Sequence, residues 1–376
     1  MSELASYSIQ AVFFALVAVV VVSRSKKTDL YQFALISIWL IGVIVIYARY
    51  KDDQVLFYSN DQLFHRDVIE YYLTVEGIQV REIISLRYLL TVPVYFISLL
   101  GFDAMLIIKF LQLSALLLLY KRSQQFLSEQ SLQIRFWQLP LIAGPILIFM
   151  SLLSLRDVLL AYFALVFVTS VPLGYRILGL SGAFALRPHL GVALAFGFVI
   201  SHFYSRWKPK LHSLSISIIG LLSYVLGTSA YWIGAVIQQG ANYDSPNTVF
   251  TQFKFSQLGA NFLGLQFLAL NDSDNGLVAA STFTLLVSRL VFFDTLLIPV
   301  LFLIAVFRHP EFLMKQKGLA FHAFMFFYGV VSQTSFNSTR QNIPFLACMG
   351  VLAVADIEHF RKIKAKVAPK LLMASR

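Results

Sequence analysis

Four side chains that could transfer a proton lie close together in the sequence: Asp61, His65, Asp67 and Glu70. Such a concentration is unusual in a chain in which only 13% of residues are charged. A carboxylate can act as a general base toward an attacking hydroxyl group, and a histidine can assist it or bind a metal ion. We therefore predict that this segment is a catalytic loop. The simpler alternatives are an ordinary solvated histidine and an Arg66–Glu70 pair that only supports a helix.

Basic side chains accompany this cluster at the expected ends of apolar segments. Arginine binds a phosphate or diphosphate through parallel hydrogen bonds, so acids and arginines at one membrane surface suit a reaction on a phosphorylated lipid. A charge at the centre of a membrane helix costs roughly 2.5–3.5 kcal/mol, so a retained charge needs a reason. The simpler alternative is that these groups anchor helix ends in the headgroup layer. The candidates are Arg156 with Asp157, Arg187 with His189, Lys254 or Arg289, and Arg340.

The composition is that of a membrane protein. Hydrophobic residues make up 58% of the 376-residue chain, and the mean hydropathy is +0.73. The net charge of +11 would suggest nucleic acid in a soluble protein. Here the basic residues cluster in short loops, which the positive-inside rule explains better. Cys348 is the only cysteine, so the chain forms no internal disulfide.

The apolar segments predict an all-α, polytopic integral membrane protein with about eleven transmembrane helices, its N-terminus outside and its C-terminus inside. We expect one membrane domain over residues 1–376, located in the cytoplasmic (inner) membrane with the active face external. Asp294 lies inside an expected span, where it either caps a kink or faces a cavity. The expected spans are 7–22, 30–47, 103–120, 138–155, 158–171, 173–185, 190–204, 214–237, 288–307, 318–331 and 343–357.

Two long external loops, 48–103 and 238–276, are expected to carry surface-lying helices. The first contains the acid cluster. Its helical spacing predicts that the acids face water and that an apolar side rests on the membrane, formed by Leu63, Val68, Tyr71 and Tyr72. Residues 85–100 are apolar enough to cross, but the charge distribution favours a helix in the outer leaflet, interrupted at Pro93.

The order of these features resembles the GT-C superfamily of membrane glycosyltransferases, which use lipid-linked sugar donors. The resemblance implies that Asp61 is the essential acid of the first external loop, that Arg187 contacts donor phosphate, and that Arg340 lies near the donor phosphates. The segments that carry it are SNDQLFH at 59–65, VPVYFISLLG at 92–101 with the later Lys109, LRD at 155–157, LGLSGAFALRPH at 178–189, and STRQNIP at 338–344.

Within this superfamily, a compact and basic chain looks most like bacterial O-antigen and exopolysaccharide polymerases (Wzy or EpsG type). The implied partners are a polyprenyl-(di)phosphate-linked saccharide donor and its acceptor, membrane lipids and other polysaccharide-assembly proteins, and no nucleic acid. No cofactor is firmly implied, and a divalent metal is left open. The candidate catalytic residues are Asp61, His65 and Asp157, and the candidate substrate-binding residues are Arg156, Arg187, His189, Arg340 and Lys109.

Two other functions fit the same residues. One is the transfer of a single sugar from a polyprenyl-phosphate sugar. The other is a non-enzymatic transporter or flippase of lipid-linked saccharide, which would favour charges at the middle of several spans and two similar halves. The sequence leaves open the sugar, the linkage, the stereochemical outcome and the oligomeric state.

Overall fold

The computed structural model describes most of the N-terminal half of the chain and its last long helix. All regular structure in these residues is helical. The described residues are 2–24, 29–50, 59–75, 90–207, parts of 294–308, and 338–374. The helices are α1 (Glu3–Ser23), α2 (Leu30–Tyr50), α3 (Ser59–Thr74), α5 (Thr91–Ser98), α6 (Ala104–Glu129), η2 (Phe136–Gln138), α7 (Leu139–Ile142), α8 (Pro145–Ser151), α9 (Asp157–Thr169), α10 (Leu173–Leu186), α11 (Pro188–Trp207) and α18 (Ser338–Ala374).

Four segments of the described chain are long and apolar enough to cross a membrane: α1, α2, α6 and Ile343–Lys364 within α18. The all-helical membrane class expected from composition is therefore supported. The expected spans 214–237 and 318–331, the loop 238–276 and most of 288–307 lie outside the described residues, so the total of eleven stays a prediction.

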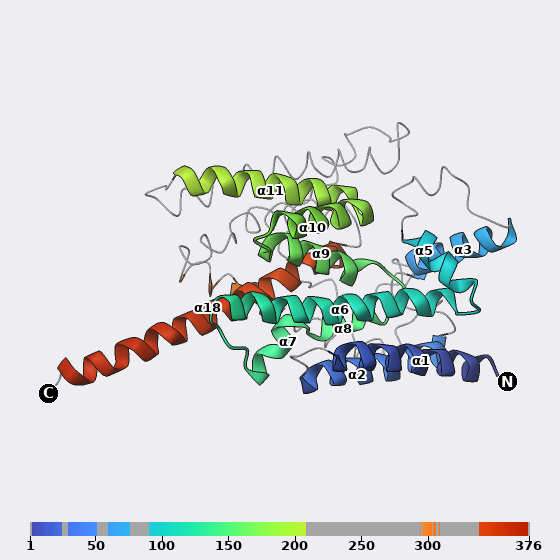
Figure 1. Cartoon of the computed structure of the whole chain (residues 1–376), viewed down its shortest axis with the longest axis horizontal. Coiled ribbons are helices and arrows are strands. Elements are labelled where there is room, and N and C mark those ends of the chain that lie inside the picture. Colours follow the sequence, from blue (N-terminus) through green and yellow to red (C-terminus); the bar gives the residue numbers. More distant parts are fainter. Residues whose placement is uncertain are drawn as a thin grey trace.

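Helix α9 lies at the centre of the described structure. It packs against α6, α10 and α18, and Figure 1 shows these helices running along the long axis of the molecule. Between its first and last residues, Asp157 and Thr169, its sequence is apolar on all sides, which is typical of a fully enclosed helix. The chain termini lie at opposite ends of Figure 1.

The contact between α9 and α10 depends on two glycines. A Cβ atom at Gly179 would lie 2.7 Å from the backbone of Phe163 and Phe167, and one at Gly182 would lie 2.5 Å from the ring of Phe163. Small residues allow helix backbones to approach closely in this way. The glycine-rich segment was expected to form a short or broken helix. It is short, at 14 residues, but continuous.

The expected span 138–155 is not one helix but the short helices η2, α7 and α8. The break falls at Gly144, just before Pro145, and its freed backbone groups are bonded by side chains from other segments. Tyr31 Oη donates to the carbonyl of Ala143 at 2.7 Å, and the N–H of Ile146 donates to Asp294 Oδ2 at 2.9 Å. Asp294 therefore caps a helix inside the bundle, the first of the two roles expected for it.

The other end of α8 is held from α2. Trp39 Nε1 donates to the carbonyl of Ser151 at 3.1 Å, and Trp39 is fully buried. Two separate segments, α2 and the segment that carries Asp294, therefore fix the path of this broken helix.

Helix α6 begins where α1, α3 and α5 meet, at the end of the bundle that contains the N-terminus (Figure 1). Asp103 caps it by accepting a bond from the N–H of Leu106 at 2.7 Å. The N–H of Asp103 itself donates to Gln10 Oε1 of α1 at 2.8 Å. These bonds tie α1 to the start of α6.

Pro93 lies in the first turn of α5, where backbone N–H groups have no intrahelical partner, so proline is tolerated there. Residues 85–89 lie outside the described part, so the expected interruption at Pro93 stays a prediction.

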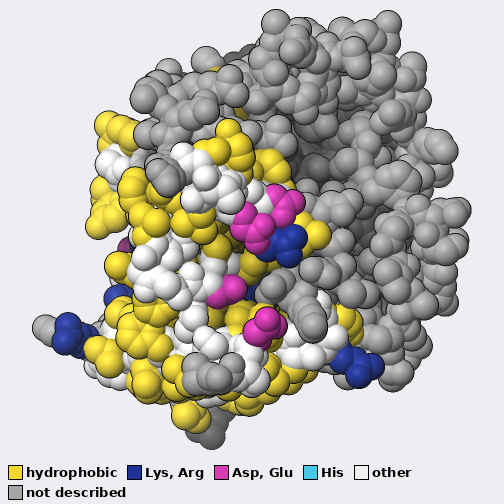
Figure 2. All heavy atoms as spheres, turned by 90° about the vertical axis from the view of Figure 1, so that its right-hand side faces the viewer, with side chains coloured by type: hydrophobic (Ala, Val, Ile, Leu, Met, Phe, Trp, Pro, Cys, Tyr) yellow, Lys and Arg dark blue, Asp and Glu magenta, His cyan; other side chains and the backbone are white. Residues whose placement is uncertain are grey.

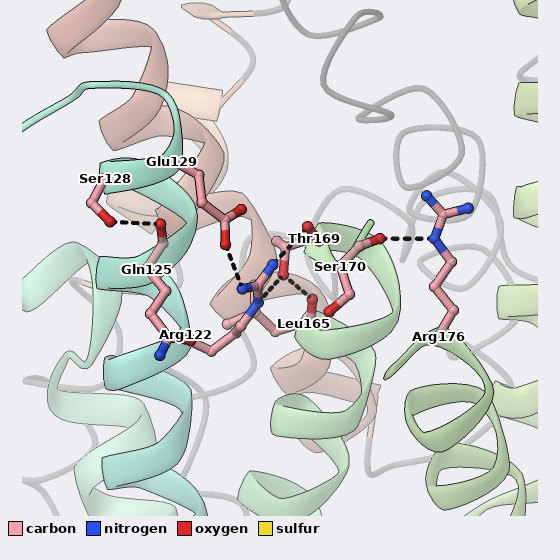
Figure 3. Close-up of polar contacts among 8 residues, drawn as sticks. All are labelled: Arg122, Gln125, Ser128, Glu129, Leu165, Thr169, Ser170 and Arg176. Carbon is pink, nitrogen blue, oxygen red and sulfur yellow. Dashed lines mark hydrogen bonds and ion pairs between the residues drawn. The ribbon is translucent and has the colours of Figure 1, made fainter. Parts of the chain in front are cut away.

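Two arginines donate hydrogen bonds to the C-terminal end of α9 (Figure 3). Arg122 donates through Nε to Thr169 Oγ1 at 2.9 Å and through Nη2 to the carbonyl of Thr169 at 2.7 Å. Arg176 Nε donates to the carbonyl of Ser170 at 2.7 Å. Basic groups at a helix C-terminus bond its last carbonyl groups and complement its dipole.

The contact between α18 and α7 provides the first test of this packing. A Cβ atom at Gly350 would collide with the carbonyl oxygen of Leu141, whereas one at Gly174 would meet nothing within 4 Å. We predict that Gly350→Ala destabilises the protein by about 1–3 kcal/mol, because backbone cannot give way as a side chain can. Gly174→Ala should leave stability unchanged or raise it by up to ~1 kcal/mol. Thermal unfolding of both variants in detergent measures this, and equal midpoints would contradict the packing.

Candidate functional site

Helix α3 buries one stripe of its surface against the protein. His65, Ile69 and Tyr72 are buried, at 4%, 0% and 0% exposure, while Tyr71 is 45% exposed. Tyr72, which was expected to face the membrane, is therefore enclosed by the protein instead, because α3 packs against α5 and α6. The membrane contact expected for Leu63, Val68 and Tyr71 stays a prediction.

The acids of α3 lie on the opposite side. Arg66 Nη2 lies 3.2 Å from Asp67 Oδ1, and Arg66 Nε lies 3.5 Å from Glu70 Oε1. Both acids are exposed, so these ion pairs fit the simpler reading, in which they support a solvated helix face. Figure 2 views this end of the molecule and shows acidic side chains gathered beside a basic group among hydrophobic ones.

Two catalytic candidates lie on α3. His65 is enclosed rather than solvated, which removes the ordinary surface role considered for it. Asp61 lies in the first turn of the helix, one turn before His65, and its side chain is outside the described part.

The clearest polar contact among the candidate residues joins Asp157 to Arg187. Arg187 Nη2 lies 3.3 Å from Asp157 Oδ1, and the two side chains are 7% and 0% exposed respectively. Asp157 is the first residue of α9, where a carboxylate complements the helix dipole. Arg187 lies in the extended link that ends α10, just before Pro188, as expected for a residue preceding proline. The fold thus pairs two predicted site residues that are thirty positions apart.

Gln112 joins this site from α6, although the sequence reasoning missed it. Its Oε1 accepts hydrogen bonds from the N–H groups of Val158 and Leu159 at 3.0 and 3.2 Å. The residue is fully buried. An available signal was its polar amide in the middle of an apolar span, where such a group needs a partner. Gln112 thereby caps the start of α9 beside the Asp157–Arg187 pair.

Two buried donors of this site remain unused. Within the described part of the chain, Arg187 Nη1 and Gln112 Nε2 have no hydrogen-bond partner. Buried polar groups are normally bonded, so two such donors at one helix end call for an explanation.

The remaining candidates are placed as follows. Arg156 is partly buried and immediately precedes Asp157. Lys109 is fully buried on α6, with Nζ 3.4 Å from Tyr7 Oη of α1. His189 follows Pro188 at the start of α11, and Arg340 lies in the first turn of α18.

The side chains of His189 and Arg340 lie outside the described part, as do Lys254 and Arg289. The structure therefore unites Asp157, Arg187 and Gln112, and it places Lys109 against α1. In the described ranges, no three His, Cys, Asp or Glu side chains lie close enough together to hold a metal ion.

No protein-family model matches the chain, and neither the curated proteins nor the solved structures contain a significant match.

The buried ion pair should dominate local stability. We predict that Arg187→Met destabilises the protein by about 3–5 kcal/mol, because it removes the Arg187 cation from beside the buried Asp157 carboxylate. The double variant with Asp157→Asn should recover much of this loss. Arg66→Met, which removes an exposed pair, should cost no more than about 1 kcal/mol. Thermal unfolding of the four proteins measures these effects, and equal losses for Arg66→Met and Arg187→Met would count against the assigned burial.

Proposed function

We propose that this protein is a membrane glycosyltransferase that acts on polyprenyl-(di)phosphate-linked saccharides at the outer face of the cytoplasmic membrane. In this proposal it polymerises repeat units of a surface polysaccharide. The observation that carries the proposal is the buried Asp157–Arg187 pair, in which an arginine retains an unused donor. The pair lies at the start of α9, and it contains Arg187, for which the GT-C resemblance implies a contact with donor phosphate.

The chemistry assigns distinct roles to the two groups of residues. The hydroxyl group of the acceptor attacks the anomeric carbon of the donor sugar, and the lipid (di)phosphate leaves. Asp61 removes the hydroxyl proton or orients the hydroxyl group, with His65 beside it on α3. Arg187 and Arg340 stabilise the negative charge that develops on the leaving phosphate, and Arg156 and Asp157 complete the pocket.

Burial makes Arg187 suited to this role. Asp157 holds one of its terminal nitrogens, so the guanidinium is oriented before a ligand arrives. Its 6% exposure means that a bond to a phosphate oxygen would form away from bulk water, where electrostatic interactions are stronger.

A transporter or flippase of lipid-linked saccharide is the second candidate. The break between α7 and α8 favours it, because discontinuous helices are frequent in transporters. A transporter would move the lipid-linked saccharide without forming a glycosidic bond, so the assay below separates the two functions. Single-sugar transfer differs from polymerisation in its donor, a polyprenyl-phosphate sugar.

We predict that membranes containing the protein elongate lipid-diphosphate-linked repeat units into a polymer ladder. Asp61→Asn should slow elongation by about 10²–10⁴-fold, the usual contribution of general base catalysis. Arg187→Lys keeps the positive charge but loses the planar guanidinium group with its paired donors. This variant should slow elongation by about 10²-fold. Asp67→Asn is the matched control, an exposed acid on the same helix, and it should leave the rate unchanged.

Expression and membrane insertion are compared for all variants. If both site variants elongate at the wild-type rate, the proposed site is wrong. If the wild type only transfers the lipid-linked saccharide across the bilayer, the transporter function replaces the enzyme.

A further inference from the structure

We propose that Gln112 and Arg187 form a two-donor site for a single oxyanion at the start of α9. This inference rests on the proposed function, because it assigns the oxyanion to the phosphate group of the lipid-linked donor. It adds a residue on α6 that neither the sequence reasoning nor the GT-C resemblance selects.

The orientation of the Gln112 amide is fixed by its neighbours. Two backbone N–H groups, of Val158 and Leu159, point at one end of the amide, so that end must be the oxygen. Nε2 is bonded to the same carbon as this oxygen and therefore lies at the same helix end. The side chain is fully buried, and this nitrogen has no partner in the described part of the chain. A group that only capped α9 would need the oxygen alone.

Arg187 supplies the second donor in the same way. Nη2 is occupied by Asp157 Oδ1 at 3.3 Å, while Nη1, on the same guanidinium carbon, is buried without a partner in the described residues. Asp157 is the first residue of α9, and Gln112 bonds the N–H groups of the next two residues. The two unused donors are thus anchored to three consecutive residues of one helix.

The charge of this helix end favours an anion. The Asp157 carboxylate offsets the charge of Arg187 at this helix end. The α9 N-terminus adds a partial positive charge of about one half. Both unused groups are donors, so the matching ligand atoms are acceptors, and phosphate oxygens satisfy both requirements. A neutral hydroxyl oxygen could also accept from both donors, but it would add no negative charge to complement the helix dipole.

The substitution Gln112→Glu separates ligand binding from capping. The carboxylate still accepts from Val158 and Leu159, and a negative charge suits a helix N-terminus, so the fold should persist. It replaces the Nε2 donor by an acceptor, which would repel an oxyanion. Gln112→Met removes both functions. Gln10→Glu is the matched control, because Gln10 also accepts a backbone N–H, that of Asp103, at the start of α6.

The test measures binding of farnesyl diphosphate to the purified full-length protein in detergent, with farnesol as the uncharged probe and inorganic pyrophosphate as the probe for the headgroup alone. The wild type should bind farnesyl diphosphate more tightly than farnesol. Gln112→Glu should raise the Kd for farnesyl diphosphate at least about tenfold, the effect of losing a hydrogen bond to a charged group, at an unchanged unfolding temperature. Gln10→Glu should change neither quantity.

Three outcomes would overturn the inference: no preference of the wild type for the diphosphate, unchanged binding in Gln112→Glu, or a loss of unfolding temperature in Gln112→Glu as large as in Gln112→Met. Failure of the proposed function is recognised separately. In that case the protein would bind farnesyl diphosphate through Gln112 and Arg187 yet form no polymer from lipid-linked repeat units.

Discussion

The described structure depends on how the unpaired backbone N–H and C=O groups at the two ends of α9 are hydrogen-bonded. At 13 residues this helix is shorter than the roughly 20 that cross a membrane, so its ends lie within the protein. Four N–H and four C=O groups at such ends lack intrahelical partners, and lipid offers none. Helix α6 supplies partners at both ends, through Gln112 at the start of α9 and Arg122 at its close. Because Gln112 precedes Arg122 on α6, the two helices must run in the same direction.

This parallel pairing determines where the functional residues lie. Two helices that run the same way need a return segment between them, and the broken helices η2, α7 and α8 provide it. The close glycine contact with α10 then holds the following link beside the start of α9. Arg187, at the end of α10, consequently reaches Asp157. The ion pair is thus a product of helix direction, a glycine interface and the break before Pro188.

The sequence predicted the helices better than the contacts between them. The ranges of α1, α2, α9 and α10 agree with the apolar segments to within a few residues, because hydrophobicity and flanking charges are local signals. Asp157 and Arg187 were both selected, but their pairing depends on the fold and was not predicted. Gln112 was missed because its role exists only when α9 begins beside it.

The break at Gly144 was missed for the same reason. It is stabilised by side chains far away in the sequence, among them Tyr31 and Asp294, whose proximity no local pattern reveals. The contacts of α3 with the protein were not predicted. The sequence reasoning placed the apolar side of this helix on the membrane, whereas α5 and α6 pack against the helix in the structure.

Asp294 and Gln112 both cap the start of a helix from another segment, but only Gln112 indicates a ligand. Each is a buried side chain from another segment that accepts a bond from the first turn of a short helix, α8 or α9. The N–H of Ile146 gives the Asp294 carboxyl group a capping role. Gln112 carries an amide that accepts and donates, and its donor is left over. A carboxylate could also cap α9, but it would bury a further charge. The amide avoids that charge and provides a donor as well, and an oxyanion held together with Arg187 is the use that we propose for this donor.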